Sequence, residues 1–196
     1  MQYKTILGAA ALALTSFTGF AASFYNPVTD ELVFDTESFE FTGSCGTSSV
    51  SPNEESGSFD LIYESVIANA KDHEIIDKTC QLKFDVEVPA GWKVEVQTEA
   101  AIGGTYLGTN LVSFQHTLAG TTREAAFEYL TGAGTYAISQ PLEILGSSYC
   151  GEDVTLKTVA NLIALGNGGL SLVNLSNGSL NGTSTSWRYF LNFYPC

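Results

Sequence analysis

The feature that most constrains this chain is its set of four cysteines, all of which follow an N-terminal segment with the features of a secretion signal. They are Cys45, Cys80, Cys150 and Cys196. Thiols oxidise and stay oxidised outside the reducing cytosol, so an even number of cysteines behind such a signal predicts two disulfides. Four thiolates on a zinc ion would need closely spaced pairs, which this sequence lacks. We therefore expect disulfides and no metal site.

The first residues predict a signal peptide. Lys4 supplies a positive charge, residues 6–14 are apolar, and small residues follow near Ala21 and Ser23. The apolar run is too short for a permanent transmembrane helix. We expect residues 1–21 to be the signal peptide, with cleavage after Ala21 or Ser23. The mature protein is then expected to be secreted, extracellular and free of the membrane.

The remaining length is that of one domain, and it can bury a substantial core without help from disulfides. We expect residues 22–35 to form an extended N-terminal arm and residues 36–196 to form a β-sandwich domain. The chain carries 21 acidic against 8 basic residues, a formal net charge of −13. Such a surface repels phosphate backbones, which argues against a nucleic-acid partner.

The strongest local pattern predicts a β-hairpin between Cys80 and Val96. Apolar and polar residues alternate up to Val88, the residues Pro89-Ala90-Gly91 interrupt the run, and the alternation resumes at Trp92. A period of two across a short turn is typical of two strands that each bury one face.

Shorter patterns predict further strands, and they favour an all-β fold for the whole chain. Many short strands with glycine-rich turns favour a two-sheet antiparallel β-sandwich, Ig-like or jelly-roll-like, with two disulfides, and a closed barrel is the alternative. Only residues 66–76 could hold a helical turn or two. The further strands are expected at 38–42, 58–63, 154–162 and 187–193, with a second hairpin formed by 124–130 and 134–139.

Four cysteines allow three pairings, between which a sequence does not choose rigorously. We favour Cys45–Cys80 and Cys150–Cys196, because each bond would tie an early loop of one half of the chain to a strand. Loops of these lengths correspond to about 4 kcal/mol each in the chain-entropy model.

An ordered set of motifs suggests a family. Gly43-Ser44-Cys45, Thr79-Cys80-Gln81-Leu82, Pro89-Ala90-Gly91-Trp92 and Cys150-Gly151 are followed by an aromatic strand that ends at Cys196. With these motifs the chain resembles, from about Phe39 to Cys196, the secreted fungal and bacterial family catalogued as domain of unknown function 4360. It departs from that pattern at Phe193, where a tryptophan would stand. The resemblance implies a β-sandwich with these disulfides and supplies no catalytic residues.

The sequence offers little for catalysis. His73 lies in a charged stretch and His116 on an expected strand, and neither comes with a recognisable base and orienting group. A glycosidase needs two carboxylates across a cleft, which Glu87, Glu95 or Glu128 could supply, yet chance matches abound in so acidic a chain. We expect no catalytic residue and no cofactor, with a carbohydrate-active hydrolase as the alternative.

The acidic loops do not predict a calcium site. Glu54-Glu55, residues 72–77 and Glu152-Asp153 lie in turn-like contexts, but none has the alternating ligands and glycine of an EF-hand. Solvation explains these side chains adequately.

Three N-x-Ser/Thr acceptor motifs begin at Asn174, Asn177 and Asn181. In a eukaryotic secretory route we expect at least one of them to carry a glycan and to face solvent. The alternative is a glycine- and asparagine-rich turn that matches the motif by chance.

The expected function is that of a noncatalytic extracellular glycoprotein, structural or binding to polysaccharide or cell wall. Tyr106, Tyr129 and Tyr149 are the candidate ligand-facing aromatics, whereas Trp92 and Trp187 are assigned to the core because large buried aromatics dominate core energetics. A self-assembling surface protein is a further alternative, in which the N-terminal arm would pair with the sheet edge of a neighbour.

Overall fold

The computed structural model describes residues 23–25, 32–35, 39–46, 48–53, 57–63, 66–175 and 186–196. The expected signal peptide lies outside these ranges. Over them the chain forms strands and turns and no helix, so none that could cross a membrane. The prediction of an antiparallel all-β fold with two disulfides is confirmed.

The strands follow one another along the chain with short connections. They are β1 Ser23–Tyr25, β2 Leu32–Asp35, β3 Glu40–Gly43, β4 Ser49–Asn53, β5 Ser58–Ile62, β6 Val66–Ala70, β7 Ile75–Val86, β8 Trp92–Leu118, β9 Thr121–Ser147, β10 Val154–Leu165, β11 Ser171–Leu175 and β12 Ser186–Pro195. Within the expected arm, β1 and β2 pair with each other as a separate two-stranded sheet.

Two strands of 27 residues each, β8 and β9, organise the fold. They form one antiparallel hairpin that turns at Ala119-Gly120. On its other side, β8 pairs first with β12 over residues 92–101 and later with β10 over residues 109–118. The single strand β8 therefore belongs to two sheet regions, which are joined by its own continuous backbone.

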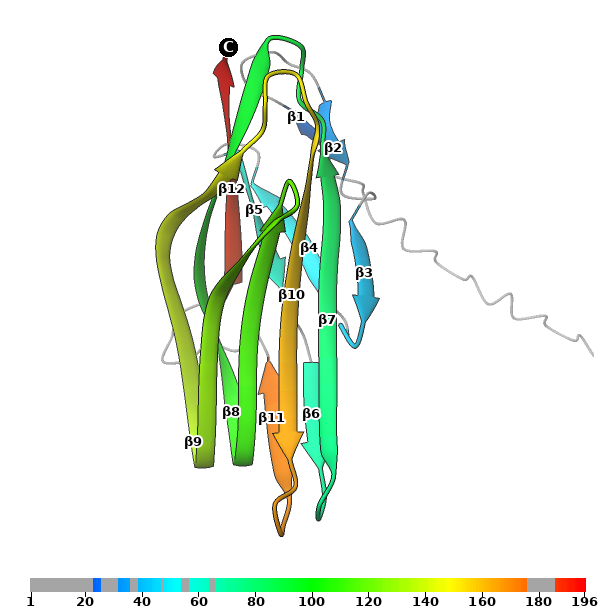
Figure 1. Ribbon diagram of the computed structural model, residues 1–196, viewed down its shortest axis with the longest axis vertical. Coiled ribbons are helices and arrows are strands. Elements are labelled where there is room, and N and C mark those ends of the chain that lie inside the picture. Colours follow the sequence, from blue (N-terminus) through cyan, green and yellow to red (C-terminus); the bar gives the residue numbers. More distant parts are fainter. Residues whose placement is uncertain are drawn as a thin grey trace, which may run out of the picture.

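These two regions are the two layers of an open, half-barrel-like sandwich. One layer, here the β10 layer, has the order β3–β7–β10–β8 and ends in the first half of β9. The other, the β12 layer, has the order β4–β5–β12–β8 and ends in the second half of β9. In Figure 1 β7 and β10 lie in front, with β12, β5 and β4 behind them.

Aromatic side chains from both layers fill the space between them. Phe59 on β5 stacks on Tyr189 of β12 with ring centroids 5.0 Å apart, and its edge meets Phe84 of β7 at 4.9 Å. These rings are fully buried, as is Trp187. Trp92 is partly buried against the same core. The aromatic contacts between β5 and β7 join the two layers.

The predicted hairpin from Cys80 to Val96 is wrong in its pairing, although its strands are right. β7 pairs with β10 and β3, whereas the start of β8 pairs with β12. Pro89 to Gly91 therefore carries the chain from one layer to the other. Alternation shows that a strand buries one face, and it does not identify the strand beside it.

Two further predictions also fail. The expected second hairpin around residues 131–133 is a single strand, β9, because each half of β9 pairs with β8 instead of with the other half. The expected helical turn at 66–76 is strand β6 followed by a turn and the start of β7. β6 is stabilised by pairing with β11, a strand about 100 residues later in the chain. Local sequence propensity does not predict a pairing between such distant segments.

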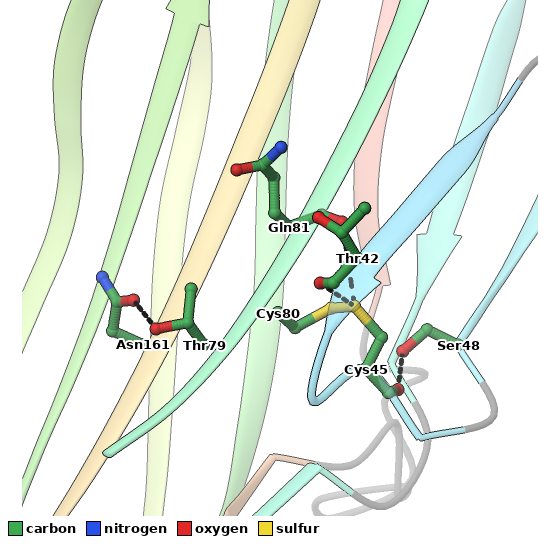
Figure 2. The surroundings of a disulfide bond; sticks show 7 residues. All are labelled: Thr42, Cys45, Ser48, Thr79, Cys80, Gln81 and Asn161. Carbon is green, nitrogen blue, oxygen red and sulfur yellow. Dashed lines mark hydrogen bonds between the residues drawn. A yellow bond between two sulfur atoms is a disulfide. The ribbon is translucent and has the colours of Figure 1, made fainter.

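Both favoured disulfides are present. The first joins Cys45, in the loop that follows β3, to Cys80 on β7. The second joins Cys150, in the turn that follows β9, to Cys196. Figure 2 shows Cys45 reaching Cys80 on β7 from the loop after β3. The loop turns at Gly43, whose φ is +86° and whose missing Cβ would lie 2.2 Å from the carbonyl oxygen of Thr79. Glycine is required there, because the Ser44 N–H donates to that same oxygen at 2.7 Å.

Loss of Cys196 should destabilise the fold. The Cys150–Cys196 bond spans 46 residues, and in the chain-entropy model a Cys196→Ser variant loses about 4 kcal/mol of unfolding free energy. Urea denaturation measures this loss, and thiol titration should find one free thiol in the variant and none in the parent. A variant without a titratable Cys150 thiol would contradict the pairing.

A close backbone approach at the bend of β8 depends on Gly104. A Cβ there would lie 2.0 Å from the carbonyl oxygen of Asn174 on β11. The Asn174 Oδ1 also accepts a hydrogen bond from the Thr105 N–H at 2.7 Å, and the Tyr136 hydroxyl donates to the Asn174 carbonyl at 2.7 Å. These hydrogen bonds hold Asn174 against β8, between the half of β8 that pairs with β12 and the half that pairs with β10.

Replacement of Gly104 by alanine should therefore separate β11 from β8. We expect the free energy of unfolding to fall by about 1–3 kcal/mol, the usual cost of overpacking. Gly169→Ala is the matched control, because a Cβ added at Gly169 would meet nothing within 4 Å, and a change within about 0.5 kcal/mol is expected. Equal urea midpoints for the two variants would refute the close approach.

Candidate functional site

A hydrogen-bonded polar cluster lies inside the core. The Nδ1 of His116 on β8 is 3.3 Å from the hydroxyl of Thr158 on β10 and 3.1 Å from the hydroxyl of Tyr189 on β12. The two hydroxyls are 2.5 Å apart. Among the described residues, the His116 Nε2 and the nearby buried Tyr63 hydroxyl have no hydrogen-bond partner.

This cluster is sealed from solvent. His116 is 1% exposed and Thr158 and Tyr189 are fully buried. Burial lowers the pKa of His116 from 6.5 to about 3 and raises the pKa of Tyr189. A substrate has no access to these groups, so the cluster has the character of a structural link between layers. His73 lies instead in an exposed turn with a φ of +63°.

The burial of His116 should make stability depend on pH. The unfolded chain binds a proton below about pH 6.5, whereas the folded state stays neutral down to about pH 3. Because the unfolded state binds more protons in that window, the free energy of unfolding falls as the pH falls, by about 1.4 kcal/mol per pH unit. A His116→Asn variant should lose this slope.

Urea unfolding between about pH 7 and pH 5 measures the slope before most carboxylates titrate. His73→Asn is the matched control, since that position is exposed. Parallel pH profiles for the parent chain and His116→Asn would contradict a neutral buried imidazole.

The outer face of the β10 layer carries two exposed aromatic rings. Phe127 and Tyr129 on β9 are 56% and 59% exposed. They are two residues apart on one strand, so both point outward, about 7 Å apart. The intervening and following positions, Glu128 and Leu130, face the other way, and Leu130 is buried. Sequence reasoning selected Tyr129 and missed Phe127, which its period-two relation to Tyr129 could have revealed.

Each ring continues into a row of side chains across the layer, since residues opposite each other in a ladder share a face. The register aligns Phe127 with Ser113, Asn161 and Thr79. The Thr79 hydroxyl donates to Asn161 Oδ1 at 2.9 Å, as drawn in Figure 2, and Asn161 Nδ2 donates to Ser113 Oγ at 3.4 Å. This row is therefore an ordered line of polar groups that ends in an aromatic ring.

The neighbouring row is mostly apolar. The register aligns Tyr129 with Leu111 on β8, Ile163 on β10 and Asp77 on β7. Leu111 and Ile163 are half-buried, while Asp77 is exposed at the far end. We call the two rows together the aromatic platform: Phe127, Ser113, Asn161, Thr79, Tyr129, Leu111, Ile163 and Asp77.

A polar hollow of about 430 Å³ lies on the other layer. Arg188 on β12 donates to both carboxylate oxygens of Asp60, at 2.8 and 3.0 Å, and more weakly to Glu99 at 3.5 Å. The hydrogen bonds to Asp60 raise the pKa of Arg188. Gln140 lines the same hollow and is 9% exposed, and its Oε1 has no hydrogen-bond partner in the described part of the chain.

The other candidate aromatics lie away from the platform. Tyr149 is 81% exposed in the turn after β9, and Tyr106 is partly buried against the core. Of the carboxylates considered for glycoside hydrolysis, Glu95 and Glu128 belong to different layers. Glu95 accepts a hydrogen bond from Gln97 in the β12 layer, whereas Glu128 is paired in register with Val112 in the β10 layer.

Some residues of the acidic loops and acceptor motifs are described by the structure, and others lie outside the described ranges. Asp153 accepts a hydrogen bond from the Val88 N–H at 2.8 Å. Within the described ranges, no three His, Cys, Asp or Glu side chains are grouped so as to hold a metal ion. Glu54-Glu55, Asn177 and Asn181 lie outside those ranges. Glycosylation, including that of Asn174, stays a prediction.

Comparison with known proteins supplies no family. No family model and no curated protein matches this sequence. Among solved structures, the chain is similar to TmCBM61 in complex with beta-1,4-galactotriose, with a TM-score of 0.26 and 12% identity over 82% of this chain and 90% of that one.

Two other solved structures show comparable similarity. The enzymatically active domain of bacteriophage CBA120 tailspike protein 4 has a TM-score of 0.23 at 12% identity, over 80% of this chain and 20% of that one. The structure of infectious bursal disease virus Gx strain has a TM-score of 0.30 at 13% identity, over 89% of this chain and 40% of that one. Likenesses this low carry no argument, so function must be argued from the residues themselves.

Proposed function

We propose that this chain is a noncatalytic extracellular protein that binds polysaccharide on the aromatic platform. The observation that carries the proposal is the pair of neighbouring rings, Phe127 and Tyr129, more than half exposed on one face. Phe59 and Trp187, by contrast, are fully buried in the core. Exposed apolar groups gathered on one face are characteristic of binding surfaces.

The chemistry of the platform suits a sugar polymer. The apolar faces of sugar rings stack on aromatic rings, and their hydroxyl groups exchange hydrogen bonds with amides and hydroxyls. Phe127 and Tyr129 offer the first contact. The half-buried Asn161 and the exposed Thr79 offer the second, while Ser113 is buried and holds Asn161 in place. Small-molecule sites are usually concave and enclose their ligand, whereas an open sheet face favours an extended polymer that crosses several strands.

An extracellular location is part of the same proposal. It is supported by the predicted signal peptide and by the two disulfides, which persist in oxidising compartments. Membership of the family of domain of unknown function 4360 is likewise proposed, on the motifs around the four cysteines. A noncatalytic role is favoured because His116 is sealed in the core and because Glu95 and Glu128 belong to different layers.

Self-assembly by strand addition has less support. β9 is an edge strand in the described fold, yet its ladder with β8 shifts register at three places, and Pro141 stands at one of them. Bulges and proline on an edge hinder pairing with another strand.

Polysaccharide pull-down with the mature protein tests the proposal. Cellulose, chitin and an insoluble β-glucan serve as probes, and we expect at least one to retain the protein. Phe127→Ala and Tyr129→Ala should each weaken that binding about tenfold or more, because exposed rings that stack on a ligand act as hot spots.

Tyr149→Ala is the matched control, since that ring is more exposed still but lies off the platform. Equal retention of all three variants would contradict the assigned surface. Release of reducing sugar from a retained polymer would overturn the noncatalytic part, and an absence of binding to every probe would overturn polysaccharide recognition.

A further inference from the structure

The two halves of β9 face each other across an opening at one edge of the sandwich, here called the mouth. Its lining comes from residues 126–128 of the first half and from residues 137–141 and 143 of the second. Figure 1 shows the two halves next to each other along one side of the molecule. At one end, Arg123 of the first half donates a hydrogen bond to the Ile144 carbonyl of the second at 3.2 Å. The volume of the mouth is about 480 Å³, within the range of about 300–1,000 Å³ usual for small-ligand sites.

Two glutamates occupy inner positions of β9 in the mouth. Glu128 is paired in register with Val112, and Glu143 with Thr98, and both partners are fully buried. Residues opposite each other in a ladder share a face, so the glutamates lie on the inner faces of the two layers and on opposite sides of the mouth. A neighbouring inner position, Ile138, is apolar and buried. Charged residues at positions that periodicity reserves for the core are a departure expected at functional sites.

Gln140 supplies the observation that points to a ligand. The register places it opposite Ala100, in the inner row that continues to Trp187. Its side chain therefore faces the space between the layers, where it lines the mouth and is 9% exposed. Its Oε1 has no hydrogen-bond partner in the described part of the chain. A buried acceptor without a partner is costly, and native proteins satisfy it with protein, water or a ligand.

The charge of the mouth indicates the class of ligand. Within the described ranges, neither Glu128 nor Glu143 makes an ion pair, and no basic residue belongs to the lining. Arg123 at the end is a single positive charge and does not balance both carboxylates. Two like charges that face each other repel, and a cation between them removes that repulsion. The formal charge of −13 on the whole chain adds a long-range attraction for cations.

Two other roles explain less of this arrangement. Inward charges protect an edge strand against pairing with another chain, but that role does not account for a buried amide oxygen without a partner. Glycoside hydrolysis needs an environment that keeps one carboxyl group protonated. Glu128 and Glu143 are both exposed to water, which instead favours an ionised pair.

We infer that the mouth binds a cationic amino-sugar residue. Its ammonium group lies between Glu128 and Glu143, and one of its hydroxyl groups donates to the Oε1 of Gln140. Its apolar ring face meets Ile138. The inference rests on the proposed function, since Phe127 belongs to the aromatic platform and also lines the mouth. It gives the bound polymer a chemical class, a polysaccharide with free amino groups.

NMR titration of the isotope-labelled mature protein with glucosamine, glucose and glucuronate tests the charge preference. At about pH 6 a carboxylate is ionised and an aliphatic amine is protonated. Glucosamine should shift the side-chain amide signals of Gln140 and the backbone signals of residues 126–128 in a saturable way, with a Kd of about 1 mM. Glucose and glucuronate should bind at least about tenfold more weakly. Equal or tighter binding of either, or the absence of a saturable shift at these signals, would refute the inference.

Glu128→Gln and Glu143→Gln keep the size of each side chain and remove its charge. Each should weaken glucosamine binding about tenfold and leave the urea midpoint unchanged, because both groups are exposed. Glu87→Gln is the matched control, since it removes the same charge from an exposed position outside the mouth, and it should leave the affinity unchanged. An equal loss in Glu87→Gln would reveal a general effect of charge and would contradict the assigned site.

Gln140→Leu tests the contact with the buried amide. The change removes the unpartnered acceptor and keeps a side chain of similar size, so the urea midpoint should stay unchanged or rise. The affinity for glucosamine should nevertheless fall about tenfold. A variant that binds glucosamine as the parent chain does would contradict the hydrogen bond to Gln140.

Tyr129→Ala separates the mouth from the platform, because Tyr129 does not line the mouth. The variant should bind glucosamine as the parent chain does and lose retention on polysaccharide. Chitosan, whose amino groups are free, should retain the parent chain more strongly than chitin, whose amino groups are acetylated. Retention on chitin without any glucosamine shift would refute the mouth and keep the platform, whereas glucosamine binding without retention on any polymer would refute the platform alone.

Discussion

The continuous ladder between β8 and β9 is the interaction on which the rest of the structure depends. Because β8 pairs with β12 in one layer and with β10 in the other, its backbone joins the layers directly. The bend between its two halves admits β11 only because Gly104 has no side chain. The rings of Phe59 and Phe84 then fill the space that this arrangement encloses.

Directional bonds add specificity to that packing. Apolar contacts tolerate small shifts of one layer over the other, whereas the Thr158–Tyr189 hydrogen bond crosses from β10 to β12 at a defined point. His116 shares both hydroxyls and stays neutral, since burial lowers its pKa to about 3. A histidine that looks like a candidate catalyst in the sequence thereby becomes part of the link between layers.

The outer surface of the sandwich depends on β9 as an edge strand. Its first half presents Phe127 and Tyr129 outward, and its second half opens a hollow where Pro141 and Leu142 bulge away from β8. The same register shifts hinder pairing with another chain. The first half of β9 thus keeps the rings of Phe127 and Tyr129 exposed on the outer face of the β10 layer.

The alternation of Leu82, Phe84 and Val86 was sufficient to predict a strand and the face that it buries. Similar patterns predicted the all-β class, and Tyr129 was correctly expected to be exposed. Pairing was not accessible in the same way, as β7 lies beside β10 instead of β8. Arg188, Asp60 and Gln140 come from three separate strands, and no local pattern relates them. The sequence by itself determined which residues turn inward, because periodicity depends only on the local backbone. The tertiary structure alone decided which strands are neighbours and which outward side chains meet, because those follow from packing between distant segments.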